Sequence, residues 1–95
     1  MDIQYNGNLE NGSFFIHEND QLLAKITYVS QGDSVIVIDH TFVSESLKGK
    51  GVGKKLVMEV VALARKHQMK ILPLCSFAHA IMNKDADLQD LMVKD

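Results

Sequence analysis

The chain has a single cysteine among its 95 residues, so an internal disulfide bond is impossible. Free thiols are typical of reducing compartments, and we therefore expect a cytoplasmic protein. No apolar run approaches the roughly 20 residues of a transmembrane helix. The first ten residues also lack the charged-then-apolar order of a secretory signal peptide. These absences predict a protein with no membrane partner.

Basic residues are too few for a general nucleic-acid binder. The 10 Lys and Arg residues against 12 Asp and Glu residues give a net charge of −2, which argues against nucleic acid as a partner. Hydrophobic residues make up 46% of the sequence, which is typical of a globular protein and argues against disorder. The length suits one domain over residues 1–95 and not two.

Hydrophobic spacing predicts the order strand, strand, strand, helix, strand, helix. Aromatic and β-branched runs predict strands, and an apolar stripe at helical spacing predicts a helix. The expected strands are 12–18, 21–29, 35–43 and 70–76, and the expected helices are 52–67 and one or two short ones within 77–93. The β-branched strand 35–43 is expected to be largely buried on both faces.

The strand at 35–43, the helix at 52–67 and the strand at 70–76 form a crossover unit. Such units are almost always right-handed, and they make their two strands parallel. We therefore expect an α+β protein with a mainly antiparallel sheet and one parallel pair. A glycine-rich turn follows the first parallel strand, where open α/β sheets bind their ligands.

That turn lies within LKGKGVGKKL, residues 47–56, which contains three glycines and four lysines. A helix start has free N–H groups and a partial positive charge. Gly49, Gly51 and Gly53 would keep these groups accessible and permit positive φ angles. With the lysines they predict a cradle for phosphate. The alternative is a flexible, solvated loop before a helix.

Two common phosphate-binding motifs do not fit this turn. A P-loop needs Ser or Thr after Gly-Lys, but Gly53 and Lys54 are followed by Lys55. A dinucleotide-binding turn needs the spacing G-x-G-x-x-G, whereas here the spacing is G-x-G-x-G. The phosphate ligand is therefore expected to be of another class.

The segment 48–53 resembles the pyrophosphate loop of the GNAT superfamily of acyl-CoA-dependent N-acetyltransferases, whose motif is Gln/Arg-x-x-Gly-x-Gly/Ala. Lys48 replaces the first Gln or Arg and keeps a hydrogen-bond donor. The whole sequence is similar to the small YjdJ-type branch of that superfamily, and IDHTFVSESLKGKGVGKKL and LCSFAHAIM carry this resemblance. It extends from about residue 13 to residue 91.

The resemblance implies a GNAT-like minimal domain that binds acetyl-CoA as co-substrate, without a metal, and transfers the acetyl group to an amine acceptor. In the superfamily the pyrophosphate binds the loop, and the pantetheine arm pairs with the preceding strand, from which the next parallel strand splays. The residues implied in coenzyme A binding are Thr41, Phe42, Val43, Lys48, Gly49, Lys50, Gly51, Val52, Gly53 and Lys54. Pro73 independently favours the splay, because proline cannot complete a sheet ladder; the alternative is an edge-strand proline with no role at the ligand.

Cys75 and His40 are the candidate catalytic residues. Cys75 comes just before a predicted helix, where the thiol pKa tends to be lowered, and it could carry the acetyl group as a covalent intermediate. The alternative is a small buried core residue. Strand alternation places His40 on the face of Ile36, Ile38 and Phe42, within reach of Cys75. There it could act as general base; the alternative is a structural histidine bonded to the backbone.

Other functions stay open at this stage. A metal site at Cys75, His79 and His40 lacks the clustered spacing of structural zinc ligands. The chain is short for its superfamily, and it lacks the elements that usually shape the acceptor pocket. A non-catalytic coenzyme A or acyl-CoA-binding module is therefore the main alternative, and a phosphate-binding interaction domain is a third. The acceptor is not indicated, and we expect a monomer or a weak dimer.

Overall fold

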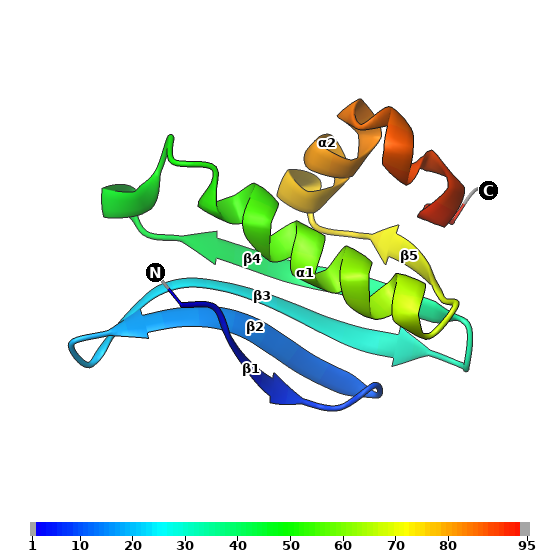
Figure 1. The fold of residues 1–95 in the computed structure, drawn as a ribbon, viewed down its shortest axis with the longest axis horizontal. Coiled ribbons are helices and arrows are strands. Elements are labelled where there is room, and N and C mark those ends of the chain that lie inside the picture. The colour runs from blue at the N-terminus through cyan, green and yellow to red at the C-terminus, as the bar shows by residue number, and fades with distance from the viewer. Residues whose placement is uncertain (1, 94–95) are drawn as a thin grey trace.

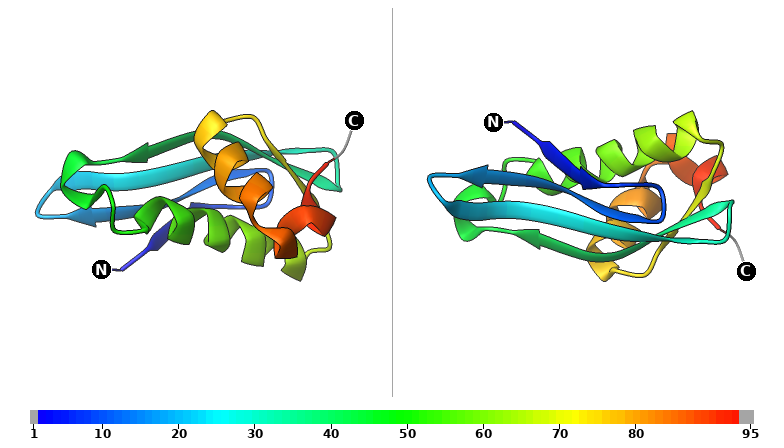
Figure 2. Two further views of the ribbon diagram at one scale, coloured as in Figure 1. Left: turned by 90° about the horizontal axis from the view of Figure 1, so that it is seen from above. Right: turned by 90° about the horizontal axis from the view of Figure 1, so that it is seen from below.

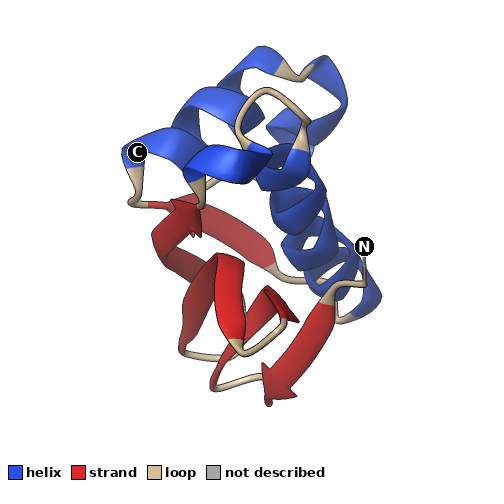
Figure 3. Ribbon diagram, turned by 90° about the vertical axis from the view of Figure 1, so that its left-hand side faces the viewer, coloured by secondary structure: helices blue, strands red, loops and turns tan. Residues whose placement is uncertain are grey.

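The computed structural model describes residues 2–93 and has helices on one face of a five-stranded sheet (Figures 1 and 3). The sheet contains β1 (Gln4–Gly7), β2 (Asn11–Glu18), β3 (Gln21–Gln31), β4 (Val35–Val43) and β5 (Lys70–Pro73). The helices are α1 (Val52–Lys66) and α2 (Ser76–Lys84), with two short 3₁₀ helices, η1 (Glu45–Leu47) and η2 (Ala86–Leu91). None of the helices in this described part is long and apolar enough to cross a membrane.

The sheet has the order β1-β2-β3-β4-β5, with antiparallel pairs up to β4 and a parallel pair between β4 and β5. The predicted fold class is thus confirmed. The sequence did not predict β1, because all four of its residues are exposed and leave no pattern of burial. β5 ends at Pro73, three residues earlier than predicted.

Helix α1 covers the sheet with one apolar stripe, and α2 lies beside it near β4 and β5 (Figure 2). The buried residues of α1 are Val52, Gly53, Leu56, Val57, Val60, Val61 and Ala64. Their spacing of three and four residues keeps them on one face of a 3.6-residue helix. Arg65 and Lys66 end the helix, where the helix dipole favours cations. The predicted helix is therefore confirmed.

A β-bulge in β4 changes which side chains face the helices. Tyr28 pairs with Ile38, but Thr27 pairs with His40, so Asp39 has no partner of its own on β3. One extra residue reverses the alternation of side chains beyond it. Ile38 is therefore buried, whereas His40 and Phe42 lie exposed on the outer face.

The prediction that His40 lies on the buried face of this strand is therefore wrong. Thr41 and Val43 occupy that face instead, since they pair with the fully buried Ile26 and Ala24 of β3. The expected burial of β4 on both faces holds only for its first half, where Ile36, Val37 and Ile38 are buried.

Tyr28 joins the core to the first hairpin through its hydroxyl group. The side chain is 1% exposed. Its hydroxyl donates a 2.7 Å hydrogen bond to the carbonyl of Asn8 and lies 2.5 Å from the hydroxyl of Tyr5. Gly12 makes room for it, because a Cβ at that position would stand 2.7 Å from the Tyr28 hydroxyl oxygen.

We expect Tyr28→Phe to lower the free energy of unfolding by about 1 kcal/mol, the typical net value of a buried hydrogen bond. Burial, followed by the hydrogen bond and charge of Tyr5, raises the pKa of Tyr28 above its ordinary value. The unfolded chain therefore ionises first. The stability due to this group is complete below about pH 10 and is lost as the pH rises further.

Urea unfolding between pH 8 and 11 measures both effects. Tyr28→Phe should lose stability at pH 8 but should show a weaker decline above pH 10. Tyr5→Phe is the matched control, because it keeps the Tyr28 hydroxyl and its bond to Asn8. An alkaline decline that is equally steep in Tyr28→Phe and in the original chain would contradict the assignment.

Candidate functional site

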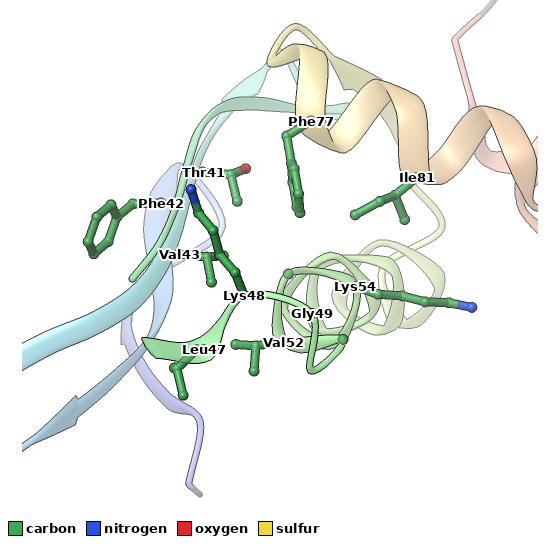
Figure 4. A pocket seen from close by; sticks show the side chains of 12 residues that line it. Thr41, Phe42, Val43, Leu47, Lys48, Gly49, Val52, Lys54, Phe77 and Ile81 are labelled. Atoms are coloured by element: carbon green, nitrogen blue, oxygen red, sulfur yellow. The ribbon is translucent and has the colours of Figure 1, made fainter. Parts of the chain in front are cut away.

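A pocket of about 630 Å³ opens where the end of β4, the turn before α1 and the start of α2 meet (Figure 4). Its lining consists of Thr41, Phe42, Val43, Leu47, Lys48, Gly49, Gly51, Val52, Gly53, Lys54, Phe77 and Ile81. Two segments that the sequence analysis had associated with coenzyme A therefore face one space, although η1 separates them in the chain. Of the ten implied residues, Lys50 alone does not line it.

Gly49 and Gly51 give the turn its left-handed backbone. Their φ angles are 79° and 73°, a region that side chains rarely adopt. A Cβ at either position would meet no atom within 4 Å, so the space beside the turn is open. Gly51 is the N-cap of α1 and has no side chain to bond the first N–H groups. Those N–H groups, together with the helix dipole, favour an anion at this point.

Gly53 has a different role from the one predicted. It lies in the first turn of α1 and has no positive φ angle. A Cβ at this position would overlap the ring of Phe77. The missing side chain therefore makes room for Phe77, which lies against the start of α1 and is 43% exposed. This contact joins α2 to the glycine turn.

The lysines of the turn differ in their surroundings. Lys48 lies 3.0 Å from the carboxylate of Glu45, and both side chains are largely exposed. Such a pair is weak in water, so a doubly charged anion can compete with Glu45 for Lys48. Lys54 lines the pocket and forms no ion pair within residues 2–93. The turn therefore offers two cations to a ligand in the pocket.

The side of β4 that faces β5 becomes an open edge after Ile38. The last paired residue of β5 is Pro73, opposite Ile38. The next two N–H groups, of Leu74 and Cys75, both donate to the carbonyl of Ile38. Within residues 2–93, no strand pairs with β4 on this side beyond that point. The two parallel strands thus separate at the position that Pro73 predicted.

Cys75 is the N-cap of α2 and is partly buried. It does not line the pocket itself, but it contacts Thr41, which does. Its Sγ lies 3.4 Å from Thr41 Oγ1. The thiol donates to this oxygen, and the Thr41 hydroxyl can turn and donate to the thiolate. The sulfur makes no capping hydrogen bond to α2, so the N–H groups there act on it as nearby dipoles.

The pKa of the Cys75 thiol is lowered by these surroundings. Burial raises it, but the hydrogen bond with Thr41 and the N–H groups of Ala78, Phe77 and Thr41 together lower it further than burial raises it. A lowered pKa increases the thiolate fraction near neutral pH, and the thiolate is the nucleophile. Cys75 is thus a partly buried residue packed against the core, and its surroundings favour the thiolate over the thiol.

We expect Thr41→Val to raise the pH at which Cys75 reacts with iodoacetamide at half its maximal rate, because the thiolate loses its hydroxyl donor. The folded chain favours the thiolate, so this contribution to stability is present above about pH 8.5. It is lost as the pH falls through the lowered pKa.

Thr27→Val provides a matched control, since Thr27 bonds to Asp39 on the outer face, away from the sulfur. Its profile should coincide with that of the original chain. If the pH profile of iodoacetamide reaction in Thr41→Val also coincides with that of the original chain, the Thr41 hydroxyl does not stabilise the thiolate.

The two predicted catalytic residues are not brought together on one face. Cys75 contacts Thr41, whose side chain faces the helices. His40 is exposed on the opposite face of β4 because of the bulge at Asp39. Its role as general base stays a prediction without a contact to support it. The described residues contain no group of three His, Cys, Asp or Glu side chains arranged to hold a metal.

Three pocket residues were missed by the sequence analysis, namely Leu47, Phe77 and Ile81. A signal for two of them was present. Phe77 and Ile81 are four residues apart and lie two and six residues after Cys75, so a helix capped by Cys75 presents both on one face. Leu47 is buried at 7% exposure and gives no local signal of contact with a ligand.

The sequence profile of the GCN5-related N-acetyl-transferase family matches residues 13–91, which is most of the chain. The chain belongs to this family. Family membership identifies it as an N-acetyltransferase that uses acetyl-CoA. No curated protein sequence matches this acetyltransferase.

Solved structures resemble this acetyltransferase over most of its length. A GCN5-like protein from Staphylococcus aureus, solved by NMR, is 39% identical, with a TM-score of 0.79 over 99% of this chain and 89% of that one. A GNAT family acetyltransferase from Elizabethkingia anophelis with acetyl-CoA bound is 14% identical, with a TM-score of 0.62 over 79% of this chain and 52% of that one. The IAA acetyltransferase from Bacillus cereus is 21% identical, with a TM-score of 0.62 over 79% of this chain and 53% of that one. The chain thus spans about half the length of the last two.

Proposed function

We propose that this acetyltransferase holds the diphosphate of acetyl-CoA on residues 48–54 and the pantetheine arm along the open edge of β4 at residues 41–43. The pocket supports this proposal, because it joins the two segments into one space. The glycine turn supplies N–H donors and cations for the diphosphate. The open edge of β4 supplies backbone groups with the spacing that an extended, amide-containing arm can pair with.

We further propose that Cys75 accepts the acetyl group. Its thiolate attacks the carbonyl carbon of the thioester, the bond from that carbon to the coenzyme A sulfur breaks, and coenzyme A leaves as a thiolate that takes a proton from water. An amine then attacks the S-acetyl group and loses a proton, which releases the amide and restores Cys75. N–H donors near the separated strands stabilise the oxyanion in both steps. The single observation that carries this mechanism is the 3.4 Å contact between the Cys75 thiol and Thr41, a residue that lines the pocket.

A second candidate function is a coenzyme A-binding module without useful turnover. The observation that favours it is that neither Cys75 nor His40 is among the residues that line the pocket. Direct transfer from acetyl-CoA to an amine, without a covalent intermediate, is a further route on the same site. Each candidate predicts binding at the glycine turn, and they differ in the fate of the acetyl group.

We also propose that the chain belongs to the small YjdJ-type branch of the superfamily and acts as one domain over residues 1–95. The segments 38–56 and 74–82 support the branch. We propose a cytoplasmic location, supported by the single free thiol, and a monomer or a weak dimer in solution. His40 lies on the outer face of β4, and it remains part of the proposal only as a candidate proton acceptor for the amine.

Calorimetry and a turnover assay together test the proposed function. We expect coenzyme A and acetyl-CoA to bind with one-to-one stoichiometry. We also expect free coenzyme A to be released when acetyl-CoA is mixed with a panel of amines that includes peptides with free amino groups. Binding without release across the panel would favour the non-catalytic module. Absence of binding of either ligand would overturn the proposal.

A further inference from the structure

The dipeptide Asn-Gly occurs twice near the start of the chain, as Asn6-Gly7 in β1 and as Asn11-Gly12 in β2. Asparagine is one of the side chains most prone to spontaneous chemical change. A glycine that follows it has no side chain to shield the main-chain nitrogen that carries out the reaction. Both asparagine residues are exposed. Their sequence context therefore gives the two dipeptides the same reactivity.

The structure places the two dipeptides side by side, because Gly7 pairs with Gly12. A Cβ on Gly7 would lie 2.4 Å from the Cα of Gly12, so the two main chains approach closely there. The N–H of Asn8 donates to the carbonyl of Asn11, and hydrogen-bonded pairs alternate with non-bonded pairs along an antiparallel ladder. Gly7 and Gly12 are therefore a non-bonded pair, and the N–H of Gly7 points away from β2.

The strand on the other side decides which glycine N–H is held. Between β2 and β3, the N–H of Ser30 donates to the carbonyl of Glu10, so the same alternation makes Gly12 and Tyr28 a hydrogen-bonded pair. The N–H of Gly12 is thus held by β3. Within residues 2–93, β1 is an edge of the sheet and pairs with β2 alone (Figure 1). No strand of this part of the chain holds the N–H of Gly7.

Strand β1 also leaves the sheet more easily than β2. Its four residues are all exposed, and a short exposed segment near a chain end opens at low cost in free energy. The side chain that ties it down is Tyr5, whose ring centroid lies 4.8 Å from that of Phe14 and whose hydroxyl lies 2.5 Å from that of Tyr28. Strand β2 lies between β1 and β3, so its opening breaks two ladders. Asn6 therefore gains the freedom to react at a lower cost than Asn11.

We infer that Asn6 is a site of spontaneous deamidation and that the fold protects Asn11. The main-chain nitrogen of Gly7 attacks the side-chain amide carbon of Asn6, and the bond from that carbon to the amide nitrogen breaks. Ammonia leaves with the proton that the Gly7 nitrogen gives up. Water then opens the five-membered imide at either of its two carbonyl groups, which leaves aspartate or isoaspartate at position 6. This inference does not depend on the proposed function.

Isoaspartate at position 6 would release β1 from the sheet. It adds one carbon atom to the main chain, so Tyr5 and Gly7 can no longer both keep their register against β2. Tyr5 would then lose its contacts with Phe14 and Tyr28. No residue of β1 lines the main pocket. We therefore expect the modified chain to be less stable and its pocket to be unchanged.

Prolonged incubation of the intact chain at mildly alkaline pH, followed by peptide mapping, tests this inference. A protease that cuts after glutamate separates the two sites, because Glu10 lies between Asn6 and Asn11. Mass spectrometry then measures the mass gain that marks replacement of an amide by a carboxyl group. We expect this gain to develop about tenfold faster at Asn6 than at Asn11, since the edge strand opens more often.

The urea-unfolded chain is the matched control, because there neither glycine N–H is held. Asn6 and Asn11 should then react at similar rates. In the folded chain, Tyr5→Phe should speed the reaction at Asn6 and leave Asn11 unchanged, since it removes the hydroxyl contact that ties β1 to Tyr28. Similar rates at the two sites in the folded chain would overturn the inference. So would a folded chain that gains no mass at Asn6 while the unfolded chain does.

Discussion

A Gly51→Glu variant is expected to bind no coenzyme A that calorimetry can detect. Gly51 caps α1, and the space beside it is open. A carboxylate placed there would occupy the site proposed for the diphosphate and repel it. Both effects act on the same ligand group, so the loss should be complete.

Backbone strain is the competing explanation for such a loss, and the chain offers a control for it. Gly32, in the turn between β3 and β4, has a φ angle of 67°, close to the 73° of Gly51, and its Cβ direction is equally open. Gly32→Glu therefore introduces similar strain and the same charge away from the glycine turn. Both variants should lose a similar amount of stability, and only Gly51→Glu should lose binding. Undiminished affinity in folded Gly51→Glu would contradict the placement of the diphosphate.

The second large effect concerns the acetyl group itself. After mixing with acetyl-CoA in the absence of an amine, we expect the original chain to gain the mass of one acetyl group on Cys75. Cys75→Ser should gain none, because the serine hydroxyl stays protonated near neutral pH and does not attack the thioester as a thiolate does. Intact-protein mass spectrometry, followed by peptide mapping, measures the gain and its position.

Two outcomes would separate the candidate mechanisms. Acetylation of an added amine that continues at an unchanged rate in Cys75→Ser would exclude the covalent intermediate and leave direct transfer. Calorimetry on Cys75→Ser is the control for folding and for the ligand site, since coenzyme A should still bind to the glycine turn. A chain that binds acetyl-CoA but gives neither labelled Cys75 nor acetylated amine would be the non-catalytic module.

Features set by neighbouring residues could be predicted from the sequence. The turn at residues 47–56 is one case, because positive φ angles at glycine and free N–H groups at a helix start both depend on residues next to one another. The apolar stripe of α1 is another case, since the 3.6-residue period of its apolar residues can be read directly from the sequence. The separation of the parallel strands was foreseen from Pro73, because the missing N–H is a property of that residue alone.

Features set by contacts between distant segments required the tertiary structure. The bulge at Asp39 exists only in the register between β3 and β4, and it moved His40 to the outer face and Thr41 to the inner one. The partner of Cys75 is therefore Thr41, 34 residues away in the chain. The need for glycine at position 53 likewise comes from the ring of Phe77. Local backbone preferences thus determined the left-handed glycine turn, whereas strand register and helix packing decided which side chains meet at the thiol.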